Sequence, residues 1–194
     1  MKLWEIPFST NVERVTLALA HKGLAVEHVM VDPRDRSEVV RVSGQELVPV
    51  LEHEGSVVFD SERILRYLES LFPEPKLWPA DDARRSEVDV FVDWFNKVWK
   101  LPPNLIDAGE DVRVRGPQIT ASLDLFEALV SGRDFLFGAF GIADVVAFPF
   151  LKYAVDNNAG DDEPFHQILR DWLPIDGHPN VEAWIRRVDE RPRA

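Results

Sequence analysis

Two different spacings of hydrophobic residues alternate over the first third of the chain. Short, mostly apolar runs predict four strands, at residues 2–6, 26–31, 50–52 and 57–59. Hydrophobic residues at the helical spacing predict one helix over residues 10–22, between the first two strands, and another over residues 61–71. The order strand–helix–strand, then strand–strand–helix, predicts a compact α/β domain with a mixed sheet over residues 1–75.

The remainder of the chain is predicted to be wholly helical. Three prolines between residues 72 and 80 mark a rigid, extended boundary. Beyond this boundary, helices are predicted at residues 83–100, 117–130, 142–155, 164–171 and 180–190. Pro102 and Pro103 are expected to end the first of them, and the polar stretch 156–163 is expected to be a loop. We therefore expect an all-α second domain at residues 81–194.

The composition excludes several classes of function. The chain has 34 acidic and 22 basic residues and a formal net charge of −12. The basic residues are not clustered, so a nucleic acid backbone would be repelled. Cysteine is absent, which excludes disulfides, thiolate metal sites and a cysteine nucleophile. The five histidines show no metal-ligand spacing, and we expect no bound metal.

The hydropathy pattern predicts neither export nor a membrane segment. A charge and a proline fall within the first seven residues, which is incompatible with the apolar core of a signal peptide. The longest apolar run, residues 145–151, is far shorter than the ~20 residues that a spanning helix needs. We expect a cytoplasmic protein without a membrane partner.

A polar cluster stands where the first strand passes into the first helix. Ser9, Thr10 and Asn11 are followed by Glu13, and Thr10 and Glu13 have the spacing of a capping box. One interpretation is that these side chains only satisfy free backbone amides. The other is that a hydroxyl and the positive helix end form an anion site, suited to a thiolate or a phosphate. The residues alone leave both interpretations open.

Two further candidates stand at the beginning of a strand and of a helix. Pro49 directly precedes a hydrophobic strand, so it is either an ordinary trans strand entry or a cis proline that presents the Val48 backbone to a peptide ligand. Asp60 and Ser61 open the helix 61–71. They either cap this helix or bind the ammonium and carboxylate groups of an α-amino acid.

In their order and spacing, these three groups of residues resemble the glutathione-binding half of the cytosolic glutathione transferases. The resemblance extends over nearly the whole chain. It implies a thioredoxin-like N-terminal domain, followed by an all-helical domain that forms the hydrophobic substrate side. It also implies that Val48 and Pro49 hold the cysteinyl backbone of glutathione, and that Asp60 and Ser61 hold its γ-glutamyl end.

The resemblance also implies the chemistry. Alignment with the serine-type classes places the catalytic hydroxyl at Ser9, with Thr10 and Asn11 as alternatives. The implied function is a detoxifying transferase that activates the thiol of its co-substrate, glutathione, for attack on a small hydrophobic electrophile. The alternatives are a specialised glutathione-dependent isomerase, dehalogenase or peroxidase, and a non-catalytic binding protein of the same fold. The resemblance alone implies a homodimer.

Two parts of the implied site have several candidates. The glycine carboxylate of glutathione calls for a basic residue after the second strand, and Arg34, Arg36 and Arg41 all lie there. Trp94 and Trp99, on the predicted helix 83–100, are candidates for the hydrophobic substrate pocket, with core packing as the alternative.

One position departs from the family pattern. The family places a Ser or Thr cap three residues before a buried aspartate of the second domain. Here Gly141 occupies the cap position before Asp144. We expect Asp144 still to bind backbone amides, without the reciprocal side-chain cap.

Overall fold

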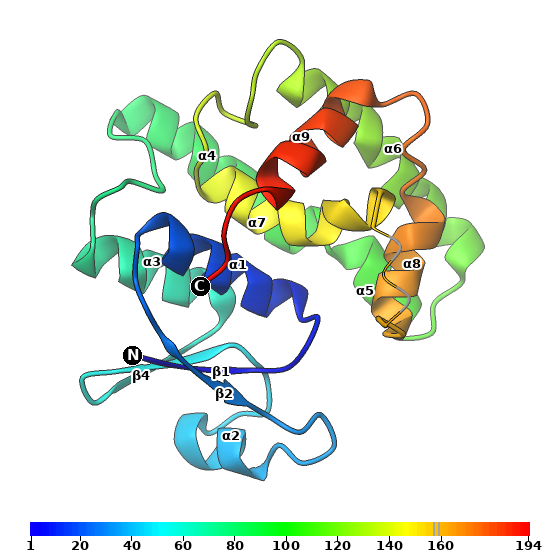
Figure 1. The fold of residues 1–194 in the computed structure, drawn as a ribbon. Helices are drawn as coiled ribbons and strands as arrows, with labels where there is room; N and C mark the ends of the chain where they lie inside the picture. Colours follow the sequence, from blue (N-terminus) through cyan, green and yellow to red (C-terminus); the bar gives the residue numbers. More distant parts are fainter. Residues whose placement is uncertain (157, 159) are drawn as a thin grey trace. The chain divides into compact units, whose positions relative to one another are not determined.

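The computed structural model describes residues 1–156, 158 and 160–194, and it consists of two compact units. The first unit comprises Met1–Leu77 together with Pro192–Ala194, and the second is Trp78–Arg191. Residues 157 and 159, in the predicted loop 156–163, lie outside the described residues. Each unit has its own secondary structure and its own core (Figure 1).

The first unit is a four-stranded mixed sheet with helices on both faces. The elements are β1 (Lys2–Glu5), α1 (Thr10–His21), β2 (Glu27–Met30), α2 (Ser37–Ser43), β3 (Val50–His53), β4 (Ser56–Phe59) and α3 (Ser61–Leu71). The strand order is β2-β1-β3-β4, with β1 parallel to β2 and antiparallel to β3. Helices α1 and α3 cover one face and α2 covers the other (Figure 1). This arrangement confirms the predicted thioredoxin-like fold.

Alternation along β1 builds a hydrophobic core on each face of the sheet. Leu3 points to one face, where it packs with Val15 of α1 and Ile64 of α3. Its neighbour Trp4 points to the opposite face and packs with Val39 of α2. The strand pattern therefore determines which helix lies over which face.

Helix α2 is absent from the sequence prediction, which leaves the segment between β2 and β3 irregular. The helix has seven residues, of which Val39 is buried. A helix this short shows no repeating apolar stripe, so its periodicity cannot be recognised. Gly44 ends the helix with a positive φ of 76°, which favours glycine.

A buried lysine fastens the proline-rich segment after α3. The Lys22 ammonium donates to Glu69 Oε2 at 2.7 Å, to the Phe72 carbonyl at 2.6 Å and to the Pro75 carbonyl at 3.0 Å. Glu69 also accepts a hydrogen bond from the Leu77 backbone N–H. All three ammonium hydrogens thus have acceptors, as a buried charge requires. The segment is held to both α1 and α3.

The second unit is all-α, which confirms the fold-class prediction. Its elements are α4 (Asp82–Trp94), a π-helical turn (Phe95–Trp99), α5 (Leu101–Asp107), α6 (Val112–Val130), α7 (Ile142–Leu151), a 3-10 turn (Lys152–Ala154), α8 (Pro164–Trp172) and α9 (Pro179–Asp189). Every residue of α7 is buried, and α7 packs against α4, α8 and α9. None of the described helices is long and apolar enough to span a membrane.

Pro102 and Pro103 do not simply end a helix, as the sequence predicts. Helix α4 passes at Phe95 into the π-helical turn, and both prolines then stand in the first turn of α5. Backbone N–H groups in a first turn have no acceptor within the helix, so prolines are tolerated there. The prediction overlooked α5 because it treated the two prolines only as breakers.

Helices α6 and α7 also differ from their predicted bounds. Helix α6 begins at Val112, ahead of Pro117, because the Asp111 carboxylate caps it by accepting from the Arg113 N–H at 2.9 Å. Helix α7 ends at Leu151 and continues only as a 3-10 turn.

A buried carboxylate organises the start of α7. Asp144 accepts hydrogen bonds from the backbone N–H groups of Leu136 and Gly141, both at 3.0 Å, and from Trp184 Nε1 of α9 at 2.8 Å. Burial raises the pKa of Asp144 to about 6, against the opposing effect of these donors. Asp144 therefore makes its half of the cap although Gly141 has no side chain to make the other half.

Three residues from the far end of the sequence belong to the first unit. Arg193 Nη2 pairs with Glu13 Oε1 of α1 at 2.8 Å, and the Ala194 N–H donates to the Thr16 carbonyl at 3.1 Å. Ala194 also packs against the core between the sheet and α1 and α3. The predicted boundaries, 1–75 and 81–194, place these residues in the helical domain instead.

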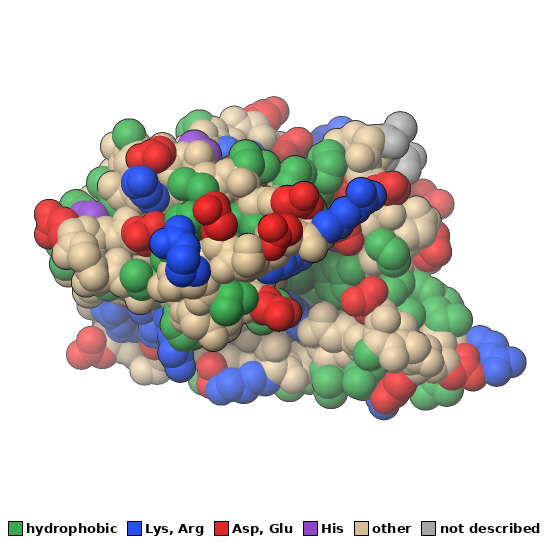
Figure 2. All heavy atoms as spheres, turned by 90° about the horizontal axis from the view of Figure 1, so that it is seen from below, with side chains coloured by type: hydrophobic (Ala, Val, Ile, Leu, Met, Phe, Trp, Pro, Cys, Tyr) green, Lys and Arg blue, Asp and Glu red, His purple; other side chains and the backbone are tan. Residues whose placement is uncertain are grey.

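Charged side chains of both signs are spread over the surface. Figure 2 shows one face, on which acidic and basic side chains are interspersed with hydrophobic ones. Many of the exposed pairs are one helical turn apart, as between Arg66 and Glu62 of α3 and between Lys97 and Asp93. Such exposed pairs add little to stability. The stability of the fold therefore comes mainly from the two cores and from the buried carboxylates and ammonium group.

Candidate functional site

The first candidate residues lie at the N-terminus of α1. Ser9 is the N-cap, and its Oγ accepts from the Val12 N–H at 3.4 Å. Thr10 is buried, whereas Ser9 and Asn11 remain partly exposed. The cap is thus made by Ser9, not by the capping box predicted between Thr10 and Glu13. Ser9 and Asn11 are the side chains that can reach a ligand at this helix end.

The second candidate, Val48–Pro49, precedes β3. The bond between them is cis, as one of the two sequence interpretations requires. Pro49 is buried, and the partly buried Val48 packs against the cores on both faces of the sheet. Among the described residues, no hydrogen bond to the Val48 backbone is found. Its N–H and C=O groups are therefore available to a peptide.

The third candidate pair opens α3. Asp60 is the N-cap, with a positive φ of 73°, and its Oδ1 accepts from the N–H groups of Glu62 at 3.1 Å and Arg63 at 3.2 Å. Asp60 itself is exposed, whereas Ser61 is buried. A capping carboxylate at the surface keeps its negative charge accessible to a cation.

A buried arginine joins the starts of α1 and α3. Arg14 Nη1 donates to Ser61 Oγ at 3.4 Å, and Ser61 Oγ donates to Asn11 Oδ1 at 3.4 Å. Burial lowers the pKa of Arg14 to about 9, while the charges of Asp60 and Glu62 act in the opposite direction. The guanidinium is therefore charged at neutral pH, and it places a positive charge directly beneath the two helix ends.

The basic candidates for the glycine carboxylate lie in different environments. Arg36 Nη1 donates to the Glu46 carbonyl at 3.1 Å, so this guanidinium braces the loop before Val48. Arg34 is exposed, and Arg41 on α2 is exposed and 3.9 Å from Glu38. Arg34 and Arg36 belong to the unit that contains the other candidates.

The two tryptophan candidates in the second unit differ in burial. Trp99 is buried, stacks on Phe95 with ring centroids 4.5 Å apart, and donates its indole N–H to Ser122 Oγ at 2.8 Å. This environment is that of a core residue, which was the alternative interpretation. Trp94 is partly exposed and contacts Phe91 and Phe95. Trp94 is thus the better candidate for contact with a ligand.

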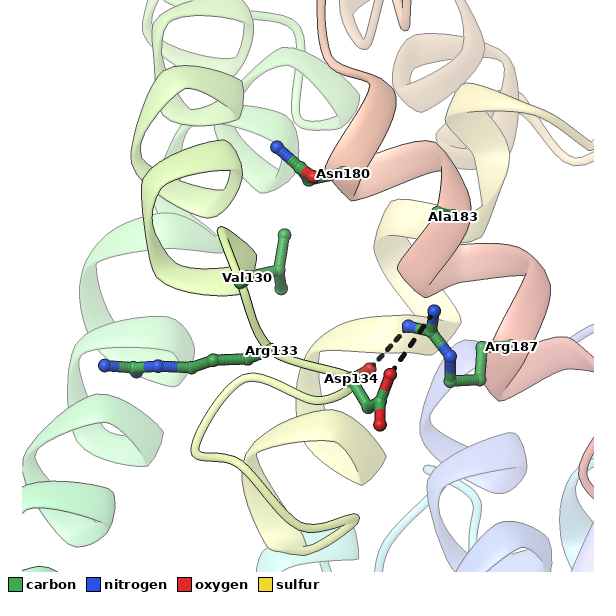
Figure 3. Close-up of a pocket in the computed structure, with 7 residues that line it drawn as sticks. Val130, Arg133, Asp134, Asn180, Ala183 and Arg187 are labelled. Atoms are coloured by element: carbon green, nitrogen blue, oxygen red, sulfur yellow. Dashed lines mark hydrogen bonds and ion pairs between the residues drawn. The ribbon is translucent and has the colours of Figure 1, made fainter.

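A polar hollow of about 260 Å³ lies in the second unit between the end of α6 and α9. Figure 3 shows Arg187 turned toward Asp134, to whose carbonyl it donates at 2.7 Å, while the Arg133 side chain extends away from them. Asn180, at the start of α9, lies at the other end of the hollow. Its backbone N–H donates to the Glu127 carboxylate of α6. The polar side chains of the hollow are bound to protein groups in and around it, and no predicted site residue lines it.

Comparison with known proteins decides the family. The model of the glutathione S-transferase N-terminal domain matches residues 3–76, and the model of the glutathione S-transferase C-terminal domain matches residues 115–187. The chain belongs to the cytosolic glutathione S-transferase family. It is therefore a glutathione transferase, built from the family's thioredoxin-like and helical domains.

Individual relatives match this chain over nearly its full length. The glutathione S-transferase GstB of Escherichia coli K12 is 26% identical over 210 residues, which cover 98% of this chain and 93% of GstB. The Tau class transferase MiGSTU from mango superposes with a TM-score of 0.81 at 20% identity, covering 98% of this chain and 89% of its own. The beta-etherase LigF from Sphingobium sp. strain SYK-6 gives 0.79 at 22% identity, with 98% and 95% covered.

Sequence reasoning missed Arg14 as a member of the site. The residue lies on the inner face of α1, among apolar side chains such as Val15 and Leu17. A basic residue within a buried helical stripe is uncommon and needs a partner. That exception to the hydrophobic pattern is the signal in the sequence that marks Arg14.

Proposed function

We propose that this glutathione transferase is of the serine type, with Ser9 donating a hydrogen bond to the glutathione thiolate. The observation that carries the proposal is the position of Ser9 as the partly exposed N-cap of α1. There, its hydroxyl and the positive helix end act on the same anion. Asn11, also partly exposed, is the alternative donor, and the buried Thr10 ranks behind both.

The free energies are sufficient for this role. A thiol with a pKa near 8.5 needs about 2.7 kcal/mol of preferential thiolate stabilisation to titrate near ~6.5. A helix end supplies roughly 0.3 to 1 kcal/mol, or up to ~2 when it is partly buried. A hydrogen bond to a charged group adds about 1.5 to 3 kcal/mol. The helix and the hydroxyl together meet the requirement, whereas the helix alone falls short.

The remainder of glutathione is assigned to the neighbouring groups. The open backbone of Val48, before Pro49, pairs with the cysteinyl residue as an added strand. The exposed Asp60 carboxylate binds the α-ammonium of the γ-glutamyl end, and Ser61 with the first amides of α3 binds its carboxylate. The charge of Arg14 beneath Ser61 favours this carboxylate.

The glycine carboxylate is assigned to Arg34 or Arg36. Arg36 is the stronger candidate because it already holds the loop before Val48 through the Glu46 carbonyl. The electrophile is a small hydrophobic molecule, with Trp94 as one contact. We further propose that the protein is a cytoplasmic homodimer with a role in detoxification, without a metal ion.

The test of the catalytic assignment is the thiolate absorbance of the glutathione complex against pH. In the Ser9→Ala variant, we expect the pKa of the bound thiol to rise by about one to two units and conjugation at neutral pH to slow roughly tenfold or more. Thr10→Ala and Asn11→Ala test the alternatives, and Ser131→Ala, an exposed serine after α6, is the matched control. A Ser9→Ala complex that titrates like the parent would show the assignment to be wrong.

Specialised chemistry is the second candidate function. LigF, whose solved structure is described as a beta-etherase, is 36% identical over 105 residues, which cover 50% of this chain and 40% of LigF. A solved relative is a maleyl pyruvate isomerase. A panel of aryl halides, aryl ethers, cis-diacids and peroxides, assayed with glutathione, separates transferase, etherase, isomerase and peroxidase activity. Glutathione binding without turnover of any of them would favour a non-catalytic binding protein.

A further inference from the structure

The loop between α2 and β3 contains an arrangement that the proposed function does not use. The side-chain amide of Gln45 pairs with both backbone groups of Leu47. The Leu47 N–H donates to Gln45 Oε1 at 2.6 Å, and Gln45 Nε2 donates to the Leu47 carbonyl at 2.8 Å. These two bonds reproduce the way in which a residue of a neighbouring antiparallel strand would pair with Leu47.

The Gln45 amide is itself held in place by α2. Its Nε2 also donates to Ser43 Oγ at 2.9 Å, and Ser43 Oγ donates to the Val39 carbonyl at 2.8 Å. The amide oxygen can only accept and the nitrogen can only donate, so these partners leave one orientation. The pairing with Leu47 is thus built into the loop rather than left to a free side chain.

Side-chain packing does not fix this part of the backbone. Leu47 is 72% exposed, the largest exposed fraction among the exposed large hydrophobic residues described. Its position depends instead on the two bonds from Gln45 and on the Arg36 bond to the carbonyl of its neighbour Glu46. The next residue, Val48, has no backbone hydrogen bond among the described residues. Leu47 and Val48 therefore differ in their backbone hydrogen bonding. The N–H and C=O groups of Leu47 are both bonded, whereas those of Val48 are both open.

We propose that Gln45 is a positioning residue that sets the register in which the tripeptide binds. An extended peptide can pair with any open backbone in the segment that precedes β3. By occupying Leu47, Gln45 leaves Val48 as the position for the cysteinyl residue. A slip of one residue would move the thiol by about 3.3 Å along the strand direction and turn it to the opposite face of the pairing, away from Ser9. This inference rests on the proposed binding of glutathione at Val48.

The variant that tests the inference is Gln45→Met, which keeps the length of the side chain but removes its donor and acceptor. We expect kcat at saturating glutathione to fall about two- to threefold, because half or more of the bound tripeptide pairs with Leu47. The dissociation constant measured by calorimetry should change less than about threefold, since the slipped complex still binds. The thiolate absorbance should titrate in a single step whose apparent pKa is raised toward the ordinary thiol value of about 8.5, because the slipped complex lacks the contact with Ser9.

Two further variants make the test specific. Gln118→Met changes an exposed glutamine on α6 and should behave like the parent in every measurement. Ser43→Ala removes the group that orients the Gln45 amide, and it should give the same changes at a smaller size. Ser43→Ala also keeps the inference testable if Gln45→Met folds poorly, as judged by its melting temperature.

Backbone amide exchange separates this inference from the proposed function. In the parent without ligand, we expect slow exchange at Leu47 and fast exchange at Val48, with glutathione slowing Val48. In Gln45→Met, Leu47 should exchange at least tenfold faster. An unchanged thiol pKa together with an unchanged kcat in Gln45→Met and Ser43→Ala overturns the role of Gln45, while the proposed function stands. Glutathione that fails to protect Val48 in the parent overturns the proposed binding at Val48 itself.

Discussion

Among the aspartates that accept from backbone amides at helix starts, Asp60 before α3 and Asp144 in the first turn of α7 lie in opposite environments. At the start of α3, Asp60 accepts from two backbone N–H groups and is exposed. At the start of α7, Asp144 accepts from two backbone N–H groups and an indole, and it is 1% exposed. Similar local chemistry thus serves the proposed ligand binding in one place and folding in the other.

The difference between them is accessibility. Every donor around Asp144 belongs to the protein, so its charge is fully committed to packing α7 against its neighbours. The Asp60 carboxylate stays accessible to solvent, so the ammonium group of a ligand can displace water from it. A capping motif in the sequence does not distinguish the two, because exposure depends on which other elements cover the helix end.

The largest expected effect follows from removing the buried carboxylate. Asp144→Ala leaves the N–H groups of Leu136 and Gly141 and the Trp184 indole without their acceptor in a dry core. We expect the free energy of unfolding to fall by roughly 3 to 5 kcal/mol, since each buried unsatisfied group costs about 1 to 3 kcal/mol. Denaturant titration measures it, with Asp176→Ala at an exposed site as the control. A loss below about 1 kcal/mol would contradict the assigned role.

The pH dependence of stability gives the next effect. Burial raises the pKa of Asp144 to about 6, so between about pH 4 and pH 6 the folded state binds more protons than the unfolded state. The contribution of this group to stability is therefore present at low pH and is lost as the pH rises, by up to about 3 kcal/mol. Asp144→Asn cannot titrate, so its unfolding free energy should lack this slope. Parallel pH profiles of parent and variant would refute the prediction.

Removing the exposed carboxylate should affect binding more than folding. Asp60→Ala and Ser61→Ala should each weaken glutathione binding by roughly 1.5 to 3 kcal/mol, measured by calorimetry. The lost cap of Asp60→Ala should cost only about 1 kcal/mol of stability. Asp81→Ala is the matched control, because Asp81 caps α4 in the same way, through the Arg84 N–H. Unchanged affinity in both site variants would mean that the γ-glutamyl end binds elsewhere.

The smallest effect concerns the cap that α7 lacks. Gly141 has extended backbone angles, φ −162° and ψ −163°, which other residues adopt without strain. Gly141→Ser supplies the hydroxyl that returns the bond to the Asp144 N–H and completes the capping box. We expect a gain of a few tenths of a kcal/mol, seen as a slightly higher melting temperature. A lower melting temperature would mean that the glycine is needed for space.

The sequence predicted what depends on long periodic patterns and on local motifs. The strands, α1, α3 and the helical second domain follow from periodic patterns, whereas the helix-end residues and the cis interpretation of the bond before Pro49 follow from local motifs. The sequence did not indicate α2, where only Val39 is buried, or α5, which begins with two prolines. A seven-residue helix carries too little periodicity to be recognised.

The residues that connect the site were equally hard to predict. Arg14 reaches Ser61 across 47 positions of the chain, and only the folded backbone brings them together. Gln45 contacts Leu47, which is only two positions away in the sequence. A loop, however, has no periodic pattern that would indicate such a contact. Both roles depend on three-dimensional placement, so the sequence contains the residues without indicating their partners.

The attachment of Pro192–Ala194 to α1 has a consequence for the order in which the protein can form during synthesis. A ribosome releases the chain from its N-terminus, and domains generally fold as they emerge. The first unit cannot make its Arg193–Glu13 and Ala194–Thr16 contacts at that stage, because the whole helical unit is translated before these residues. Until translation reaches residue 194, the nascent α1 holds the proposed catalytic Ser9 without these contacts from the C-terminal segment.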